Sequence, residues 1–278
     1  MTEAAVIEAA FRSSGLGPGD FTYQPKPGPP TPLRSFLSSD AILTIGVDAE
    51  GRRLNLVERT CRTWAGAHDI PVPRILDASD DGGWLLARRV HTRPAEGTAF
   101  VHAALDVADR IAALPAPDLD IPASQWRASR VTLPIRLVRS TVGGLNPAAF
   151  VQARRAAGSL TERTTSHGDY YRRNVLADIG GGVSVVDWEF VGPAPRWTDH
   201  VRLWSTLRRP EDRRTAWTRI TSQCTGSGAE QLAVLVRWLT LRLLAENLAA
   251  PRSQRDSADL SHARVVVSEA RTLSAALR

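Results

Sequence analysis

The stretch SHGDYYRRNVL at residues 166–176, followed by DWE at residues 187–189, carries most of the information about this chain. Asp169 is followed five residues later by Asn174, and a three-glycine turn and a short apolar run then lead into Asp187. An Asp can orient a hydroxyl and accept its proton during attack on phosphorus. Asn and a second Asp supply the hard oxygen ligands that Mg²⁺ prefers. The pattern therefore predicts phosphoryl transfer, and a loop capped by Asp and Asn side chains is the plainer interpretation.

The same residues resemble the signature of the aminoglycoside phosphotransferase and choline kinase family, whose members share a bilobal protein-kinase-like fold. That signature is His-Gly-Asp, four residues, Asn, and then Asp-Trp-Glu or a near relative after a short hairpin. The resemblance implies that Asp169 is the catalytic base and that Asn174 and Asp187 hold Mg²⁺. It also implies that His167 and Asp199 support the catalytic loop.

The rest of the chain predicts an α+β fold with two lobes. Residues 1–91 are predicted to form a small α/β lobe that binds nucleotide around an antiparallel sheet. Helix patterns fall at 2–14 and 54–68, and strand patterns at 33–37, 41–47, 74–76 and 84–90. From residue 92 to residue 278 the pattern is mainly helical, apart from a strand-rich segment near the signature. This second, larger lobe is expected to carry the catalytic loop, the metal site and the acceptor site.

The resemblance also assigns nucleotide-binding residues in the first lobe. It implies that the backbone around Arg88 and Val90 contacts the base of the nucleotide. Glu58 lies where the family places the Glu that pairs with a phosphate-binding lysine. An exposed helix charge without a partner is the alternative interpretation of Glu58.

The lysine position is the main departure from the family. The matching strand puts Thr44 there, and Thr cannot supply the positive charge that holds the phosphates. Three explanations are open. The cation has moved to Lys26 or Arg34, or the alignment is shifted so that Arg52 or Arg53 takes the role, or the chain has lost catalysis. The intact base and metal ligands of the signature favour retained activity.

Composition limits the partners and the compartment. The chain has 278 residues and a formal net charge of +6, yet it shows no nucleic-acid reading motif, which argues against a nucleic-acid partner. The most apolar run, residues 232–248, is interrupted by charges, so no membrane span is expected. The first residues do not read as a secretory signal, and two well-separated cysteines, Cys61 and Cys224, fit a reducing compartment. We therefore expect a cytoplasmic protein.

The sequence defines the molecule that accepts the phosphate less closely than it defines the phosphoryl-transfer reaction. Residues 201–278 contain 13 arginines and 7 acidic residues, which argues against a polycationic aminoglycoside. The first hypothesis is a kinase that uses Mg²⁺ and ATP, or GTP, to phosphorylate a small-molecule hydroxyl of an antibiotic or a biosynthetic intermediate. The second is a Ser/Thr kinase that acts on an acidic precursor peptide in peptide natural-product biosynthesis. The third is a non-catalytic binding protein with a kinase fold.

Overall fold

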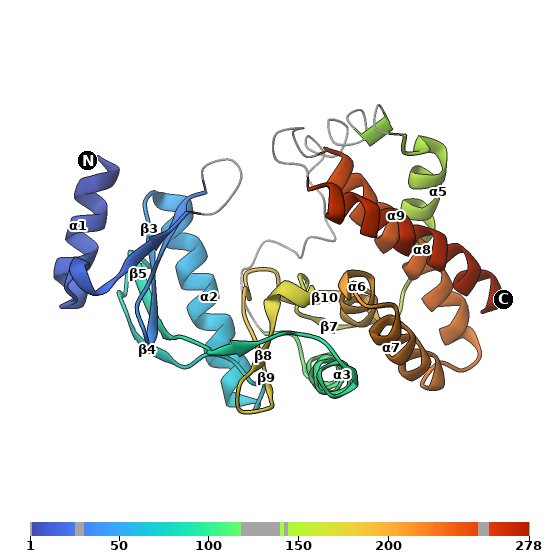
Figure 1. The fold of residues 1–278 in the computed structure, drawn as a ribbon, viewed down its shortest axis with the longest axis horizontal. Coiled ribbons are helices and arrows are strands. Elements are labelled where there is room, and N and C mark those ends of the chain that lie inside the picture. Colours follow the sequence, from blue (N-terminus) through green and yellow to red (C-terminus); the bar gives the residue numbers. More distant parts are fainter. Residues whose placement is uncertain (1, 26–30, 118–139, 142–143, 250–255, 278) are drawn as a thin grey trace. The chain divides into compact units, whose positions relative to one another are not determined.

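The computed structural model describes residues 2–25, 31–117, 140–141, 144–249 and 256–277 (Figure 1). Contacts group them into two compact units. The first contains the described residues of Met1–Ala95 together with Asn174–Glu189; the second contains those of Glu96–Asp118, Pro122–Arg173 and Phe190–Arg278. The sequence interpretation assigned residues 92–278 to the second lobe, whereas the segment Asn174–Glu189 makes its contacts within the first unit.

The first unit contains a five-stranded antiparallel sheet in the order β1-β2-β3-β5-β4. Its strands are β1 (Thr22–Gln24), β2 (Leu33–Leu37), β3 (Ala41–Gly46), β4 (Ile75–Ala78) and β5 (Trp84–Arg88). Two helices accompany it, α1 (Glu3–Ser14) and α2 (Ala49–Ala67), with a short 3-10 turn η1 at Pro18–Asp20. Helix α2 begins five residues before the predicted start at 54, because Asp48 caps it by accepting a hydrogen bond from the Gly51 N–H at 2.8 Å.

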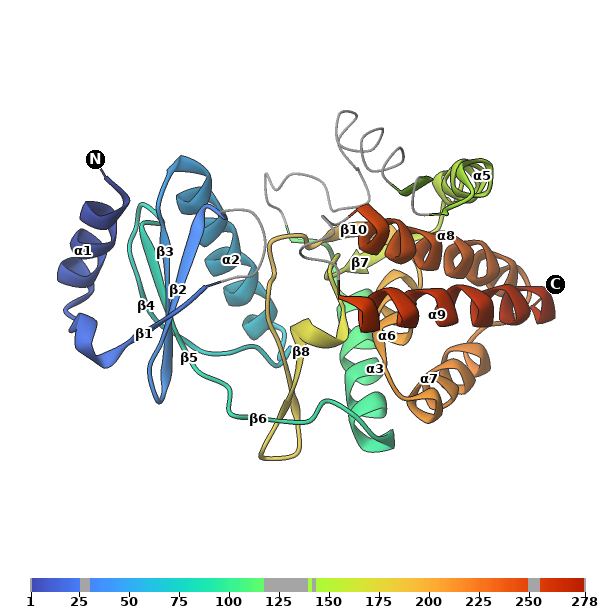
Figure 2. The ribbon, with the colours of Figure 1, turned by 45° about the horizontal axis from the view of Figure 1, so that its top comes forward.

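Helices α1 and α2 cover opposite faces of this sheet (Figure 2). Side chains alternate between the two faces of a strand, so neighbouring residues of β3 meet different helices. Leu43 and Ile45 pack in an apolar core with Phe11 of α1. Thr44 lies on the other face, and Asn55 of α2 donates to its carbonyl oxygen at 3.3 Å.

A second, three-stranded sheet in the first unit carries the end of the signature. It has the order β6-β8-β9, with β6 at Thr92–Arg93, β8 at Val175–Asp178 and β9 at Val183–Val185. Buried apolar residues at alternate positions of β8 and β9 hold the hairpin, and the Val185 N–H donates to the Pro71 carbonyl at 2.8 Å. The pairing of β8 with β9 brings Asn174, which precedes β8, close to Val186 and Asp187, which follow β9.

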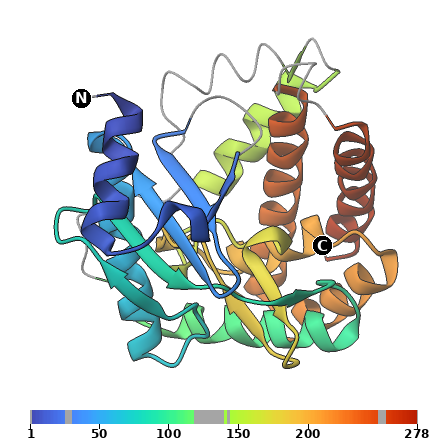
Figure 3. The same cartoon turned by 60° about the vertical axis from the view of Figure 1, so that its left-hand side comes forward.

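The second unit is mainly helical. Its helices are α3 (Thr98–Ala113), α5 (Pro147–Gly158), α6 (Thr198–Thr206), α7 (Pro210–Ser222), α8 (Ser227–Ala249) and α9 (Ser257–Ala276), and its antiparallel pair is β7 (Arg163–Ser166) with β10 (Gly192–Pro195). Helices α8 and α9 lie side by side, as the orange and red ribbons of Figure 3 show. Buried Leu232, Leu235, Val236 and Leu239 follow helical spacing along α8. None of the helices within the described residues has the length and apolarity needed to cross a membrane.

Candidate active site

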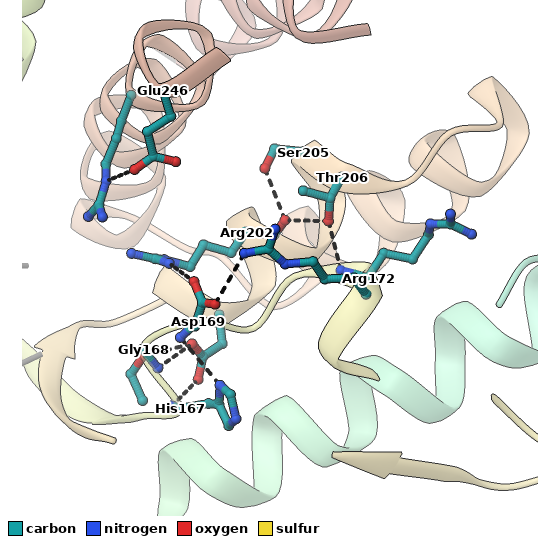
Figure 4. A network of polar contacts seen from close by, with 12 residues as sticks. His167, Gly168, Asp169, Arg172, Arg202, Ser205, Thr206 and Glu246 are labelled. Carbon is teal, nitrogen blue, oxygen red and sulfur yellow. Dashed lines mark hydrogen bonds and ion pairs between the residues drawn. The ribbon is translucent and has the colours of Figure 1, made fainter. Parts of the chain in front are cut away.

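The loop after β7, of which Figure 4 labels His167, Gly168 and Asp169, is held in place by the carboxylate of Asp199 from α6. Its Oδ1 accepts from the Ser166 hydroxyl at 2.7 Å and from the Gly168 N–H at 3.3 Å, while its Oδ2 accepts from the His167 N–H at 2.7 Å. Asp199 itself is buried. One buried carboxylate therefore satisfies three donors of the loop, which is the geometry that the predicted supporting role requires.

Glycine is required in this loop at position 168. Its φ of +82° lies in the left-handed region, and a Cβ added there would be 2.1 Å from the Phe190 carbonyl oxygen. A side chain at this position would have to push the backbone apart. The Gly of the His-Gly-Asp signature thus has a local structural cause.

His167 and Tyr170 anchor the two sides of the loop. The ring Nδ1 of His167 accepts from the Asp169 N–H at 3.3 Å, so the ring fixes the backbone of the predicted base. The hydroxyl of Tyr170 donates to the Ala104 carbonyl of α3 at 2.7 Å. Burial raises the pKa of Tyr170 well above its usual value, so the phenol stays protonated as a donor. His167 therefore holds the backbone of Asp169, and Tyr170 ties the loop to α3.

The carboxylate of Asp169 is flanked by two arginines (Figure 4). The Nη1 of Arg202 donates to Oδ1 at 3.2 Å, and the Nη2 of Arg173 lies 3.6 Å from Oδ2. Arg202 has 2% of its side chain exposed, so this is a buried ion pair. The two guanidinium groups also lie 5.1 and 5.5 Å from the ring centre of Tyr171. Cation–π attraction helps to hold them beside the carboxylate.

The sequence interpretation did not identify Arg202. The available signal was its spacing: Arg202 lies three residues after Asp199 on one helix, and residues at that spacing share a helix face. A helix that supports the loop through Asp199 therefore also presents Arg202 toward it.

A cavity of about 370 Å³ lies in the second unit beside the end of this loop. It is lined by Tyr171, Arg172, Arg173, Thr206, Arg208, Leu243, Glu246, Asn247, Asp256, Asp259 and His262. Arginines and acidic residues are equally represented in this lining, and Arg208 forms an ion pair with Asp259. His262 donates from Nε2 to the Ser205 carbonyl at 2.9 Å, and burial lowers its pKa to about 4. The wall is therefore balanced in charge near neutral pH.

A second cavity, of about 330 Å³, lies in the first unit, and its size is that of ordinary small-ligand pockets. It brings together five positions that the resemblance singled out, Thr44, Glu58, Arg88, Val90 and Asp187. They come from β3, α2, the end of β5 with the residues after it, and the β9 end of the hairpin. We call it the first-unit cavity.

Both carboxylate oxygens of Glu58 in the first-unit cavity accept hydrogen bonds. Its Oε1 accepts from the Nε of Arg62 at 2.6 Å, and its Oε2 accepts from the Trp188 N–H at 2.5 Å. Only 14% of its side chain is exposed, so it is not a solvated helix charge. Glu58 therefore connects α2 to the residue that follows Asp187.

Asn174 and Asp187 lie at the two ends of the β8-β9 hairpin. The carbonyl oxygen of buried Asn174 accepts from the Val186 N–H at 3.0 Å. Asp187 is exposed and has a φ of +67°, a conformation that Asp tolerates better than most residues. Buried Trp188 fixes the next position by donating from its indole to the Val185 carbonyl at 2.9 Å.

The donor set of this hairpin fits Mg²⁺. A carboxylate and a side-chain amide provide hard oxygen atoms, and Mg²⁺ sites commonly use one or two carboxylates together with phosphates and waters. No group of three or more His, Cys, Asp or Glu side chains within the described residues could hold a metal by itself. The fit therefore depends on the phosphates of a bound nucleotide.

Of the proposed substitutes for the lysine, the structure turns Arg34 away from the first-unit cavity. Ser35 of β2 lines that cavity, so Arg34 projects from the opposite face, where its Nε and Nη2 donate to Glu3 of α1 at 2.6 and 2.9 Å. The predicted contact of Arg34 with nucleotide does not agree with this placement. The sequence predicts that adjacent residues of a strand point to opposite faces of the sheet, but it does not predict which of the two faces lines the cavity.

Arg52 and Arg53 do not line the first-unit cavity either. Arg52 pairs with Asp81 at 2.6 Å, and Arg53 pairs with Glu50 at 2.7 Å; neither lines the cavity. Lys26 lies outside the described residues.

Comparison with known proteins gives one family and a set of similar folds. The family model described as "Phosphotransferase enzyme family" matches residues 40–253. No curated protein matches the sequence.

Three solved structures illustrate the likeness. A choline/ethanolamine kinase family protein from Mesorhizobium loti has 14% identity and a TM-score of 0.59, with 100% of this chain and 99% of that chain covered. Macrolide 2'-phosphotransferase MphH from Brachybacterium faecium has 15% identity and a TM-score of 0.60, with 99% and 98% covered. A GDP and kanamycin complex of APH(2")-IIia has 13% identity and a TM-score of 0.59, with 97% and 98% covered. At these identities the likeness concerns the fold, and it confirms the predicted α+β, protein-kinase-like class.

Proposed function

Because the chain belongs to the phosphotransferase enzyme family, we propose that it moves the γ-phosphate of ATP or GTP to a hydroxyl of a small molecule, an antibiotic or a biosynthetic intermediate. It is a kinase-type enzyme with an alcohol group as acceptor. The observation that carries the nucleotide part of the proposal is the first-unit cavity. Residues far apart in the sequence, Glu58, Arg88, Val90 and Asp187, line it together.

In this proposal the chain's own residues divide the work between binding and proton transfer. Asp169 accepts the proton of the acceptor hydroxyl as that oxygen forms its bond to phosphorus. Asn174 and Asp187 would hold Mg²⁺, which when bound neutralises charge on the phosphates. His167 and Asp199 keep the backbone of Asp169 in place through the hydrogen bonds described above.

The buried Arg202 restricts how Asp169 acts. Because Arg202 holds Oδ1, and Arg173 lies beside Oδ2, the carboxylate is oriented before an acceptor arrives. Such orientation reduces the rearrangement needed during reaction. The acceptor hydroxyl must then approach an oxygen lone pair that the two guanidinium groups leave open.

The charge-balanced cavity in the second unit supports a small acceptor over an acidic peptide. Its arginines are matched by Glu246, Asp256 and Asp259, so it offers no continuous cationic track. The small-molecule names of the solved relatives point in the same direction. Both cysteines are free thiols, in keeping with the proposed cytoplasmic location.

The test combines a binding and a transfer measurement. Calorimetric titration with ATP or GTP and Mg²⁺ should show metal-dependent binding by the wild type and its loss in Asp187→Ala. Asp178→Asn on the same hairpin is the matched control, because Asn can still accept from the Gly180 N–H that Asp178 caps at 2.8 Å. Transfer of labelled phosphate to a panel of hydroxyl compounds should then vanish in Asp169→Asn. A folded wild type that binds neither nucleotide would contradict the proposal.

A further inference from the structure

Arg62 of α2 lines the first-unit cavity together with Thr44 and Glu58. Only 12% of its side chain is exposed, and its Nε donates to Glu58 at 2.6 Å. Its Nη1 is buried and has no hydrogen-bond partner among the described residues. The sequence interpretation did not consider Arg62.

A buried guanidinium nitrogen without a partner indicates a missing acceptor. Nearly all buried polar groups in folded proteins are hydrogen bonded, and an unpaired charged donor is especially unfavourable. A guanidinium has five N–H donors, so one carboxylate cannot satisfy it. Phosphate oxygens match the planar arrangement of these donors and carry the opposite charge.

The surroundings of Arg62 show why a cation is needed there. Glu58, Asp187 and Glu189 give the first-unit cavity three carboxylates, and Thr44 contributes no charge. The cavity's other cations, Arg88 and Arg89, come from the end of β5 and the residue after it, and Arg89 already donates to the Ser38 carbonyl at 2.8 Å. Arg62 is the cation of this cavity that forms an ion pair with Glu58.

We propose that Arg62 supplies the positive charge missing at Thr44 and binds the phosphates of the nucleoside triphosphate. This inference rests on the proposed function. The supporting ion pair, which the resemblance assigns to a helix Glu and a strand Lys, is made within α2 by residues four apart. Because the other oxygen of Glu58 accepts from the Trp188 N–H, the position of Arg62 is coupled to the hairpin that ends in Asp187.

Binding measurements on substituted chains test this assignment without requiring an acceptor. Arg62→Met should weaken binding of the Mg²⁺–nucleoside triphosphate at least tenfold and leave binding of the free nucleoside unchanged, because only the phosphates contact the guanidinium. Arg62→Lys should retain part of the difference between triphosphate and nucleoside, since it keeps the charge. Arg53→Met on the same helix is the matched control, because Arg53 pairs with Glu50 and does not line the cavity.

Each outcome decides the inference. If Arg62→Met does not fold, Arg62→Gln replaces it, since Gln is neutral and can still donate to Glu58. Triphosphate binding that is unchanged in the folded variant overturns the role of Arg62. A tenfold loss of triphosphate affinity in Arg53→Met or Lys26→Met, with unchanged affinity in Arg62→Met, also overturns the role of Arg62. It would identify Arg53 or Lys26 as the cation that binds the phosphates. If folded wild type binds no triphosphate, the proposed function fails, and with it this inference.

Discussion

Each unit contains a carboxylate–arginine pair with little exposed surface, and the two pairs differ in how far apart their members lie in the sequence. Asp169 of the loop after β7 pairs with Arg202 of α6, across 33 residues. Glu58 of the first-unit cavity pairs with Arg62 one turn along the same helix. The first pair requires the fold to bring two elements together, whereas the second forms wherever α2 is helical.

This difference bears on what each pair can do. Arg202 has almost no exposed surface, so its main effect is to hold the Asp169 carboxylate. Arg62 lines the first-unit cavity, whereas Arg202 is not among the lining residues of either cavity described above. Burial beside Asp169 therefore favours an orienting role for Arg202, and a position at a cavity favours a ligand-binding role for Arg62.

The largest expected effect is a loss of stability when Asp199, which holds the loop that carries Asp169, is replaced. Asp199→Ala removes the acceptor of the Ser166 hydroxyl and of the His167 N–H, while the Gly168 N–H keeps its 3.0 Å contact with the Ser166 Oγ. Each unsatisfied buried donor costs about 1–3 kcal/mol, so we expect the free energy of unfolding to fall by roughly 4 kcal/mol. Urea unfolding followed by tryptophan fluorescence measures it. Asp178→Ala, which removes one cap at an exposed turn, should cost far less. Equal losses would mean that Asp199 does not hold the loop.

The next effect tests the Asp169–Arg202 pair directly. Arg202→Met leaves a buried carboxylate without its main partner, and breaking such a pair costs about 3 kcal/mol or more. Adding Asp169→Asn should recover much of that stability, because the uncompensated charge is removed as well. The double-mutant cycle gives the coupling energy. Additive losses would show that the two residues act independently.

Contacts between residues close in the sequence were easier to predict than contacts across the fold. The signature singled out Asp169 as a predicted base and Asn174 and Asp187 as predicted metal ligands, because fixed spacing around one loop and one hairpin is visible in a single sequence. Arg202 was missed because its partner is distant in the chain, although its spacing from Asp199 was visible. The α+β fold followed from periodicity, and the structure confirms its antiparallel sheet and helical second part.

The substitute for the lysine shows a different limit. Arg34 and Arg62 have the same side chain, and only the phase of β2 and the packing of α2 decide which one lines the first-unit cavity. Alternation along a strand gives two faces without saying which is covered by which helix. Tertiary packing supplies that choice, so sequence reasoning could name the missing charge at Thr44 but not its replacement.

A third prediction restores the family arrangement in the second pair. In an Arg62→Met background, Thr44→Lys should recover about tenfold in triphosphate affinity, equivalent to about 1.4 kcal/mol. Thr44 lies on the sheet face covered by α2, and a lysine there would share the first-unit cavity with Glu58 of that helix. Ser35→Lys, on the neighbouring strand of the same face, is the control for added charge alone. Equal recovery in both variants would show that position 44 has no special role.

The smallest expected effect is a dependence of stability on pH that comes from His262 in the second unit. Burial, with help from Arg208 and Arg213, lowers the pKa of His262 in the second unit from 6.5 to about 4. The unfolded chain therefore binds a proton between these values that the folded chain does not, so this contribution to stability is lost as the pH falls from about 6.5 to about 4. Because His262 is partly exposed, we expect a loss on the order of 1 kcal/mol.

The pH dependence of the melting temperature for wild type and His262→Gln measures this term. Gln can still donate to the Ser205 carbonyl but does not titrate, so the variant should be less sensitive to pH across that window. The first-unit cavity contains no histidine among its lining residues. Triphosphate binding should therefore show the same pH dependence in both proteins, and a change in it would mean that the effect of His262 extends beyond the second unit.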